Sequence, residues 1–401
     1  MEEKTLSLIE CDVLIIGAGA AGMMTAFEVG KQGFSVALLE HNDKVGEKIR
    51  ISGGGHCNFT NLSIEAKNYI SENPHFCKSA IARYTPYDFI EMLSEENIDY
   101  HERKWGQLFC DNSANEVVKM LLKRCKNVGV EIYTRCKIDR ISKKEHFIVN
   151  TSMGTFSGKT LVVATGGLSI PKLGATGFGY RIAQQFGLSV TKRSPALVSF
   201  IIDDKKYNLF HDLQGVSLEV IVSCRGQSFR ENLLFTHKGL SGPAILQISS
   251  YWKEGDTLSI DLLVGRSLDQ DWRRDNARQL LPNALSRFLP KRFSQQWCKQ
   301  FNYDKPLSQY NEKDLMLLEE RLHHWEVKPL KTEGYKKAEV TVGGIDTKML
   351  SSKTMEANDV KGLFFVGEVI DVTGWLGGYN FHWAWSSAHA AGTAITKMLN
   401  Q

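Results

Sequence analysis

The sequence has no long run of apolar residues and no Cys-x-x-Cys pair. Val13–Phe27 is the best candidate for a signal segment, but acidic residues precede it and glycines interrupt it, and no segment approaches the ~20 apolar residues of a membrane span. The eight cysteines are scattered, without the Cys/His spacing of a zinc site. These absences argue against a membrane protein, a bound metal and a redox-active dithiol. Unpaired thiols favour a soluble, cytoplasmic protein.

A strong charge of either sign is also missing. The 49 Lys and Arg residues nearly balance the 45 Asp and Glu residues, and no basic run is dense enough to indicate a nucleic-acid patch. The charge therefore names no partner. The expected partner is a small-molecule substrate, with neither nucleic acid nor membrane. The length of 401 residues and the 42% hydrophobic content are sufficient for two or three domains with substantial cores.

The most specific pattern is the glycine-rich segment Gly17-Ala18-Gly19-Ala20-Ala21-Gly22. It lies between a strand-like run, Asp12–Ile16, and a helical stretch, Met23–Lys31; a second strand, Ser35–Glu40, follows. In a dinucleotide site the first glycine permits the turn, the second admits the pyrophosphate and the third allows close helix packing. Glu40 stands where an acid accepts a ribose hydroxyl and disfavours a 2′-phosphate. The pattern predicts a βαβ dinucleotide-binding unit.

Two further segments favour FAD over NAD. Residues 46–58 (GEKIRISGGGHCN) are predicted to form a long loop that can lie along an extended cofactor. Near the C-terminus a strand, Leu363–Val366, ends in Gly367-Glu368, and a glycine turn at 374–380 leads into a helix from Phe381. This layout places a carboxylate on the ribityl chain and a helix N-terminus beside the flavin pyrimidine, where it stabilises negative charge on reduced flavin. The two ends of the chain should therefore build one FAD domain.

The character of the sequence changes twice between these ends. Residues 194–266 alternate as short strands, such as Leu218–Ser223 and Leu258–Leu262, whereas residues 267–334 carry apolar positions at helical spacing. The expected boundaries are 1–193 and 335–401 for the two parts of the FAD-binding domain, 194–266 for a β-rich insertion, and 267–334 for a helical subdomain with its return linker.

These motifs resemble the YhiN/BaiN-like family of FAD-dependent oxidoreductases, some of which are labelled aminoacetone-oxidase-like. The resemblance runs from Cys11 to about Gly392 and is carried by Ile51–Asn61, Ala164–Gly167, Phe235–Leu246, Val340–Asp346 and GEVIDVTGWLGGYNFHWAWSSAHAAG. It implies an α/β fold in which a Rossmann-type FAD-binding domain is split by an inserted β-barrel-like domain and a small helical subdomain.

The motifs and the resemblance together assign a set of residues to FAD binding. These are Gly17, Gly19, Ala20, Ala21, Gly22, Glu40, Lys48, Ser52, Gly53, Gly54, Cys57, Asn58, Thr165, Gly166, Gly367, Glu368, Gly378, Asn380 and Phe381.

The favoured function is hydride or two-electron chemistry at flavin N5 on a small organic substrate, either reduction of an activated C=C or oxidation of an amine or alcohol. A second GxGxxG is missing, so NAD(P)H would have to dock transiently. The alternative is an RNA-associated flavoprotein similar to tRNA-modifying enzymes, for which Lys328–Lys337 is the modest basic candidate. A third reading makes FAD purely structural.

Three histidines are candidates for proton transfer, because histidine donates protons near neutral pH. His237 lies in a glycine-punctuated loop of the insertion, and His56 and His382 flank two cofactor motifs. A histidine in such a position is equally often a hydrogen-bonding or stacking neighbour of the flavin.

Overall fold

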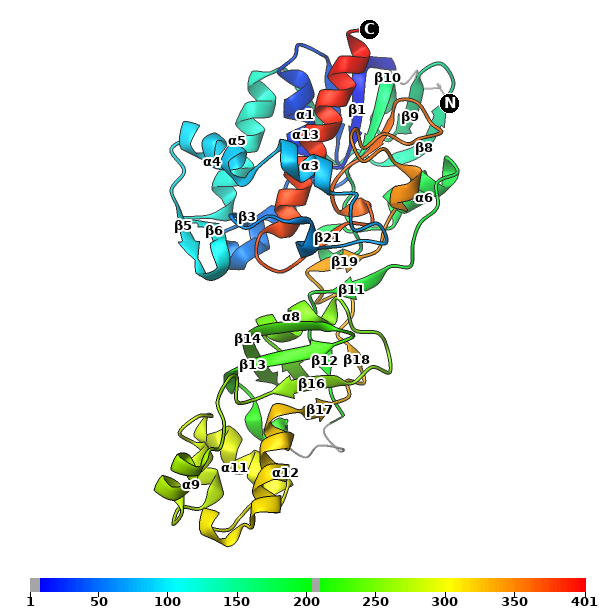
Figure 1. The fold of residues 1–401 in the computed structure, drawn as a ribbon. Helices are drawn as coiled ribbons and strands as arrows, with labels where there is room; N and C mark the ends of the chain where they lie inside the picture. Colours follow the sequence, from blue (N-terminus) through cyan, green and yellow to red (C-terminus); the bar gives the residue numbers. More distant parts are fainter. Residues whose placement is uncertain (1–7, 204–209) are drawn as a thin grey trace. The chain divides into compact units, whose positions relative to one another are not determined.

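The computed structural model describes residues 8–203 and 210–401. The chain divides into two compact units, each with its own main sheet (Figure 1). One unit contains the residues up to Ser194 together with Val340–Gln401, and the other contains Pro195–Glu339. The strands β11 (Ser194–Ala196) and β19 (Val340–Val342) lie at the two points where the chain passes from one unit to the other.

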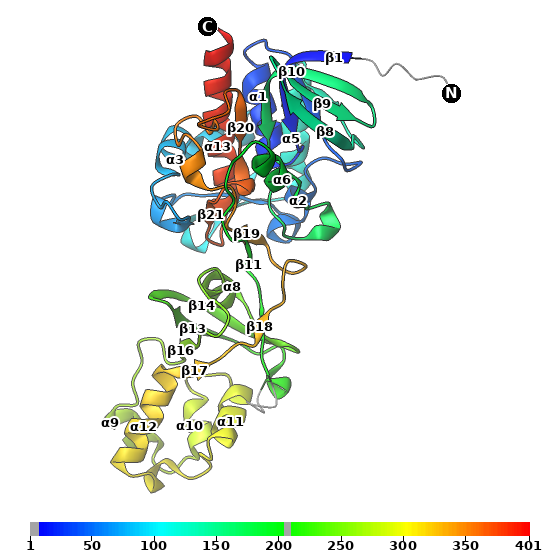
Figure 2. The same cartoon turned by 90° about the vertical axis from the view of Figure 1, so that its right-hand side faces the viewer.

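The first unit is built on a parallel sheet assembled from both ends of the chain. β1 (Leu8–Ile16) lies between β2 (Val36–Leu39) and β10 (Gly154–Val163), and β7 (Glu131–Tyr133) extends the sheet beyond β2. β20 (Leu363–Phe365) pairs with the last residues of β10, although it comes from near the C-terminus (Figure 2). The end of β1 is an uninterrupted apolar run because both faces of a parallel sheet are covered.

The first half of β10 has a second partner. It pairs antiparallel with β9 (Phe147–Thr151), which pairs in turn with β8 (Ile138–Lys143). The apolar run Thr160–Ala164 predicts only the second half of this strand, which pairs with β20. The remainder, from Gly154, is interrupted by polar and small residues that hide its strand character.

Helices from the two ends of the chain pack against each other. α1 (Ala20–Gly30) lies beside α13 (Tyr379–Leu399), and Gly392 permits close approach because a Cβ there would lie 2.5 Å from the Cβ of Glu28. The imidazole Nδ1 of His389 lies 3.1 Å from the Glu28 carboxylate. This contact joins the first helix of the chain to the last.

The remaining elements of the first unit are short. Its other helices are α2 (Glu47–Ile51), α3 (Lys78–Arg83), α4 (Pro86–Glu95), α5 (Ala114–Asn127) and α6 (Phe178–Gln185). A three-stranded sheet contains β3 (Asn58–Asn61), β6 (Gln107–Cys110) and β5 (Tyr100–Arg103), and β4 (Tyr69–Ile70) pairs with β21 (Thr373–Gly374).

The second unit combines a rolled antiparallel sheet with a helical segment. In spatial order its strands are β17 (Trp325–Val327), β16 (Leu258–Asp261), β13 (Ser217–Cys224), β14 (Gln227–Thr236), β15 (Gly239–Ser241), β12 (Phe200–Ile201) and β18 (Lys331–Thr332). Its helices are α8 (Pro243–Ser249), α9 (Gln270–Asn276), α10 (Leu281–Leu285), α11 (Lys291–Gln300) and α12 (Glu312–His323).

The two edge strands of this sheet, β17 and β18, are joined by residues 328–330 alone. That connection spans at most about 15 Å. Seven flat strands would separate the edges by about 29 Å. The sheet therefore curls toward closure, which agrees with the expected barrel-like insertion. Together with the parallel sheet and helices of the first unit, this confirms the predicted α/β fold.

Within the first unit, the segments on either side of the insertion are neighbours, because Thr191 N–H donates to the Gly344 carbonyl oxygen at 2.8 Å. We expect a variant in which a short Gly/Ser linker replaces 195–339 to fold, since the parallel sheet needs no residue from that segment. A cooperative thermal transition by circular dichroism and resistance to limited proteolysis would verify this. Aggregation of every spliced chain would contradict it.

Candidate cofactor site

The glycine turn between β1 and α1 has two packed glycines and one open one. Gly17 has φ +102°, and a Cβ there would lie 2.5 Å from the carbonyl oxygen of Ala164 at the end of β10. A Cβ on Gly22 would lie 1.8 Å from the Gly17 carbonyl oxygen, whereas a Cβ on Gly19 would meet nothing within 4 Å. The protein thus leaves free the one side where a pyrophosphate would lie.

The helix α1 begins at Ala20, inside the glycine motif and earlier than the predicted start at Met23. No side chain caps it, so the N–H groups of its first turn are suited to binding an anion. Ala21 packs inward, since a Cβ on Gly367 would lie 2.9 Å from the Cβ of Ala21.

Glu40 fixes the glycine turn to the end of β2. Its side chain is 7% exposed, and its two oxygens accept the N–H groups of Ala18 and Asn42, each at 2.8 Å. His41 Nδ1 also lies 3.1 Å from the carboxylate. A carboxylate offers about four acceptor sites, so these contacts leave capacity for a ribose hydroxyl. This geometry is compatible with the predicted role of Glu40.

The segment after β2 differs from the predicted continuous loop. Residues 47–51 form α2, anchored by the buried Ile49, and Gly46 supplies the left-handed turn before it with φ +68°. Gly53, Gly54 and Gly55 then all have positive φ, and Cβ atoms on the last two would meet nothing within 4 Å. The prediction is therefore wrong for the helix and right for an open glycine stretch after it.

The residues on either side of the three glycines have different environments. Cys57 is fully buried, and burial raises the pKa of its thiol, so the sulfur stays neutral inside the core. Ser52 holds the turn by donating its hydroxyl to the Ile49 carbonyl at 2.7 Å. His56 is half-buried, and among the described residues no group hydrogen-bonds to its buried Nδ1. An unpartnered buried nitrogen is what a site completed by a ligand leaves behind.

Glu368 is the centre of a polar cluster after β20. Lys48 donates to its carboxylate at 2.7 Å, and the backbone N–H of Thr341 donates at 2.9 Å. The hydroxyl of Ser169 lies 3.3 Å away. The sequence predicts Lys48 and Glu368 but not Ser169 or Thr341. For Thr341 the only sequence signal was the family resemblance of the segment Val340–Asp346.

Thr165 and Gly166 follow β10 at the same edge of the sheet. Gly166 has φ +68°, and a Cβ there would lie 3.9 Å from Glu368. The Thr165 hydroxyl is buried and has no hydrogen-bond partner in the described part of the chain. It is a second polar atom at this edge that a bound molecule could satisfy.

A closed glycine turn leads into α13. The Asn380 side chain accepts from Gly374 N–H at 2.9 Å and donates to the Gly374 carbonyl at 2.8 Å, so it organises the turn; contact with the cofactor stays a prediction. Gly378 approaches β3 closely, because a Cβ there would lie 2.3 Å from the Thr60 carbonyl oxygen. Phe381 stacks on Trp385 within the helix. No side chain caps α13.

The three predicted catalytic histidines occupy different environments. His382 has no exposed surface and its Nδ1 lies 2.9 Å from the Thr60 hydroxyl. Burial lowers the pKa of His382 to about 4, which keeps the ring neutral and favours a hydrogen-bonding role. His237 is exposed at the turn between β14 and β15 in the second unit, whereas His56 and His382 belong to the first. Their part in catalysis stays a prediction.

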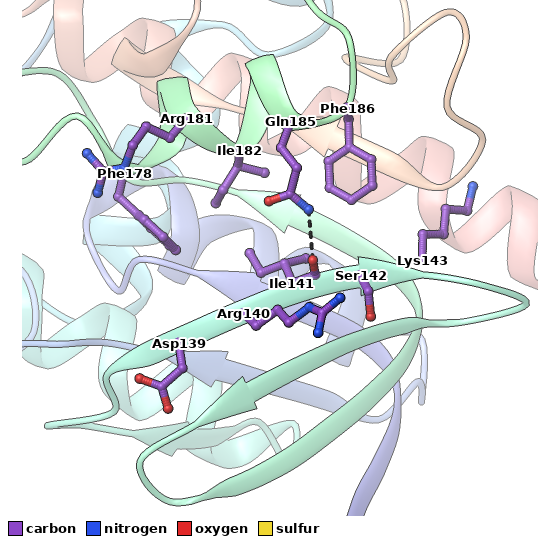
Figure 3. A pocket seen from close by; sticks show the side chains of 10 residues that line it. All are labelled: Asp139, Arg140, Ile141, Ser142, Lys143, Phe178, Arg181, Ile182, Gln185 and Phe186. Carbon is purple, nitrogen blue, oxygen red and sulfur yellow. Dashed lines mark hydrogen bonds between the residues drawn. The ribbon is translucent and has the colours of Figure 1, made fainter.

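A separate groove of about 530 Å³ lies between β8 and α6 (Figure 3). Phe178, Arg181 and Gln185 line one side and Arg140 the other, and Gln185 donates to the Ile141 carbonyl at 2.7 Å. None of the predicted cofactor residues lines this groove.

Over residues 8–203 and 210–401, no three or more His, Cys, Asp or Glu side chains are grouped to hold a metal ion. No helix in the same part of the chain has both the length and the apolar character needed to cross a membrane.

The parallel sheet, the open glycine turn, the acid after β2 and the Glu368 cluster fit FAD and define a Rossmann-type flavin-dependent oxidoreductase. Residues 11–394 match the family described as HI0933-like protein Rossmann domain, and the chain belongs to this family. The predicted family and enzyme class are thereby confirmed.

Three relatives match almost the whole chain. The chain is 46% identical to a ribosomal RNA dihydrouridine synthase of Haemophilus influenzae, over 96% of this chain and 98% of the relative. It is 49% identical to a protein of the same name from Escherichia coli, over 94% and 96%. It is 26% identical to the 3-dehydro-bile acid delta(4,6)-reductase of Clostridium scindens, over 96% and 98%.

Solved structures share the fold at low identity. The 3-ketosteroid-delta4-(5alpha)-dehydrogenase of Rhodococcus jostii RHA1 has a TM-score of 0.53 and 12% identity, with 97% of each chain covered. The Escherichia coli quinol fumarate reductase subunit FrdA has a TM-score of 0.53 and 14% identity, over 99% of this chain and 71% of that one. These likenesses show the fold alone.

Gly19→Val should fold normally and lose FAD, because its Cβ meets no protein atom but enters the space left for the pyrophosphate. Gly22→Val is the matched variant, and it should misfold, because its Cβ overlaps the backbone of Gly17. FAD released on denaturation, measured by absorbance and chromatography, together with the thermal transition, separates the two effects. Stoichiometric FAD in Gly19→Val would place the cofactor elsewhere.

His382 should make stability fall in acid. Its pKa is about 4 in the folded chain against 6.5 ordinarily, so below pH 6.5 the unfolded chain takes up a proton that the folded chain refuses. The contribution of neutral His382 to the free energy of unfolding is fully present above pH 6.5 and decreases as the pH falls to 4. The decrease amounts to about 2 kcal/mol by about pH 5. Urea unfolding near pH 7 and pH 5 should show a smaller decline for His382→Asn than for the native chain. Equal declines would refute this.

Proposed function

We propose that this protein reduces the C5=C6 double bond of a uridine in ribosomal RNA to give dihydrouridine. The observation that carries the proposal is the identity of 46% and 49% to two ribosomal RNA dihydrouridine synthases, over 94% or more of this chain. The chemistry agrees with the flavin site. The C5=C6 bond of uracil is conjugated to the C4 carbonyl, so it is an activated double bond that accepts hydride at C6.

The reaction adds a hydride to C6 and a proton to C5. FAD, when bound, supplies the hydride. The chain must hold the cofactor through the α1 N-terminus, Glu40 and the Glu368 cluster, present the uracil to it, and deliver the proton. NAD(P)H is the proposed source of electrons, and it would dock transiently because the sequence has one GxGxxG motif only.

The proton at C5 needs a donor that can change its protonation state near neutral pH. His382 is unsuited to this, since burial keeps its pKa near 4. His56, one residue after the open glycines, and the exposed His237 remain as candidates.

A second candidate function is reduction of a small unsaturated carbonyl compound. The relative named for a 3-dehydro-bile acid supports it, at 26% identity. Both functions use the same flavin chemistry on an activated C=C, so only the substrate distinguishes them. The higher identity to the RNA-modifying relatives favours ribosomal RNA.

Purified protein with bound FAD and NADPH or NADH should convert uridine to dihydrouridine in ribosomal RNA lacking the modification. The product gains two hydrogens, which nucleoside mass spectrometry detects. Gly19→Val is the matched control, because it should fold but lack FAD. Rapid turnover of small enones without any dihydrouridine in ribosomal RNA would overturn the proposal in favour of the second candidate.

A further inference from the structure

The hairpin formed by β5 and β6, residues 100–110, belongs to the same small sheet as the end of the cofactor loop. β6 pairs with β5 on one side and with β3 on the other, and β3 begins three residues after the glycine run that ends at Gly55. The hairpin is therefore an extension of the segment that is proposed to lie along FAD (Figure 1).

One side chain fixes the tip of this hairpin to the turn before α13. Asn61 is 1% exposed, and its Nδ2 donates to the carbonyl of Trp105 at 3.1 Å and to that of Gly377 at 2.9 Å. A Cβ on Gly377 would also lie 3.0 Å from the Gln107 side chain. A molecule held by the hairpin tip is thus held in a fixed relation to the N-terminus of α13.

Trp105, at this tip, has a strained backbone and an exposed side chain, so it adds little to the stability of the fold. Its backbone is left-handed, with φ +67° and ψ +28°, which is an outlier for a bulky residue. Its side chain is 64% exposed, so the indole contributes little to the core. Leu62, whose N–H donates to the Gly106 carbonyl at the tip, is 36% exposed as well. An apolar patch beside a cofactor site is a mark of ligand binding.

Two basic residues lie next to Trp105 in the sequence. Arg103 and Lys104 precede it, and the Arg103 guanidinium lies 4.2 Å from the centre of the Phe109 ring. An aromatic face for a base with cations for phosphates is the composition of single-stranded nucleic-acid sites.

We propose that the hairpin tip binds the RNA strand beside the target uridine, with Trp105 stacking on a neighbouring base and Arg103 and Lys104 contacting phosphates. This inference rests on the proposed ribosomal RNA substrate. An enzyme that acts on a base must take it out of its stack. An indole on the sheet that continues the cofactor segment would replace part of the lost stacking and hold the strand open.

The test measures binding of a fluorescein-labelled oligouridine to the FAD-loaded protein by anisotropy. Trp105→Ala should weaken binding about 5-fold to 100-fold, and Trp105→Phe should restore most of it, because stacking needs only an aromatic face. Tyr87→Ala is the matched control: Tyr87 is 68% exposed on α4 in the same unit, and its loss should leave affinity unchanged. FAD content and the thermal transition report folding of each variant.

The double variant Arg103→Ala/Lys104→Ala should also flatten the salt dependence of binding, since each lost phosphate contact lowers the slope of log K against log salt by about 0.7. Unchanged oligouridine affinity in Trp105→Ala with bound FAD overturns the inference. A change in oligomeric state without a change in affinity does the same, because it would assign the patch to a second copy of the chain.

The outcomes separate this inference from the proposed function. Dihydrouridine formation that is insensitive to Trp105 would leave the function standing and remove the hairpin from it. Trp105-dependent oligouridine binding without dihydrouridine formation would support the RNA site and overturn the reaction.

Discussion

The cofactor site depends on the absence of side chains between the glycine turn and the end of the parallel sheet. Gly17 packs against the Ala164 backbone, and Gly22 packs against the backbone of Gly17. Both contacts are too close to leave room for a Cβ atom. This contact holds the N-terminus of α1 at the edge where β1, β10 and β20 end. Gly367 approaches the same helix at Ala21. Glu40 and Glu368 lie at the same edge, because each directly follows a strand of the sheet or the turn at its end.

The parts of the site that could be predicted are those encoded locally. The glycine motif and Glu40 are separated by one strand and one helix, so their relation follows from the βαβ unit alone. The helix α2 was missed because five residues, Glu47–Ile51, are too few to show a helical period. The bonds from Ser169 and Thr341 to Glu368 join residues up to 199 positions apart, and no spacing rule predicts them.

The environment of the histidines was equally hidden from the sequence. His382 lies between aromatic residues on a helix that is buried on nearly all sides, so the polarity of its neighbours in sequence gives no sign that its ring is inaccessible. The sequence indicates Lys328–Lys337 as the basic candidate for RNA, because lysines are densest there, whereas the Trp105 tip has only two adjacent cations. The tip is distinguished by the left-handed backbone of Trp105 and by the exposure of its indole. Neither property can be predicted from the amino-acid composition.

The insertion of the second unit also orders events during synthesis. β10 is complete at Val163, but its parallel partner β20 begins only at Leu363. At a translation rate of about 5–20 residues per second, synthesis of the roughly 200 intervening residues takes about 10–40 s. During that interval the last residues of β10 lack their second neighbour and are open to wrong partners, while the inserted unit can already fold. Because β20 and α13 follow the inserted unit in the chain, the part of the FAD cradle that they supply is completed only after that unit has been synthesised.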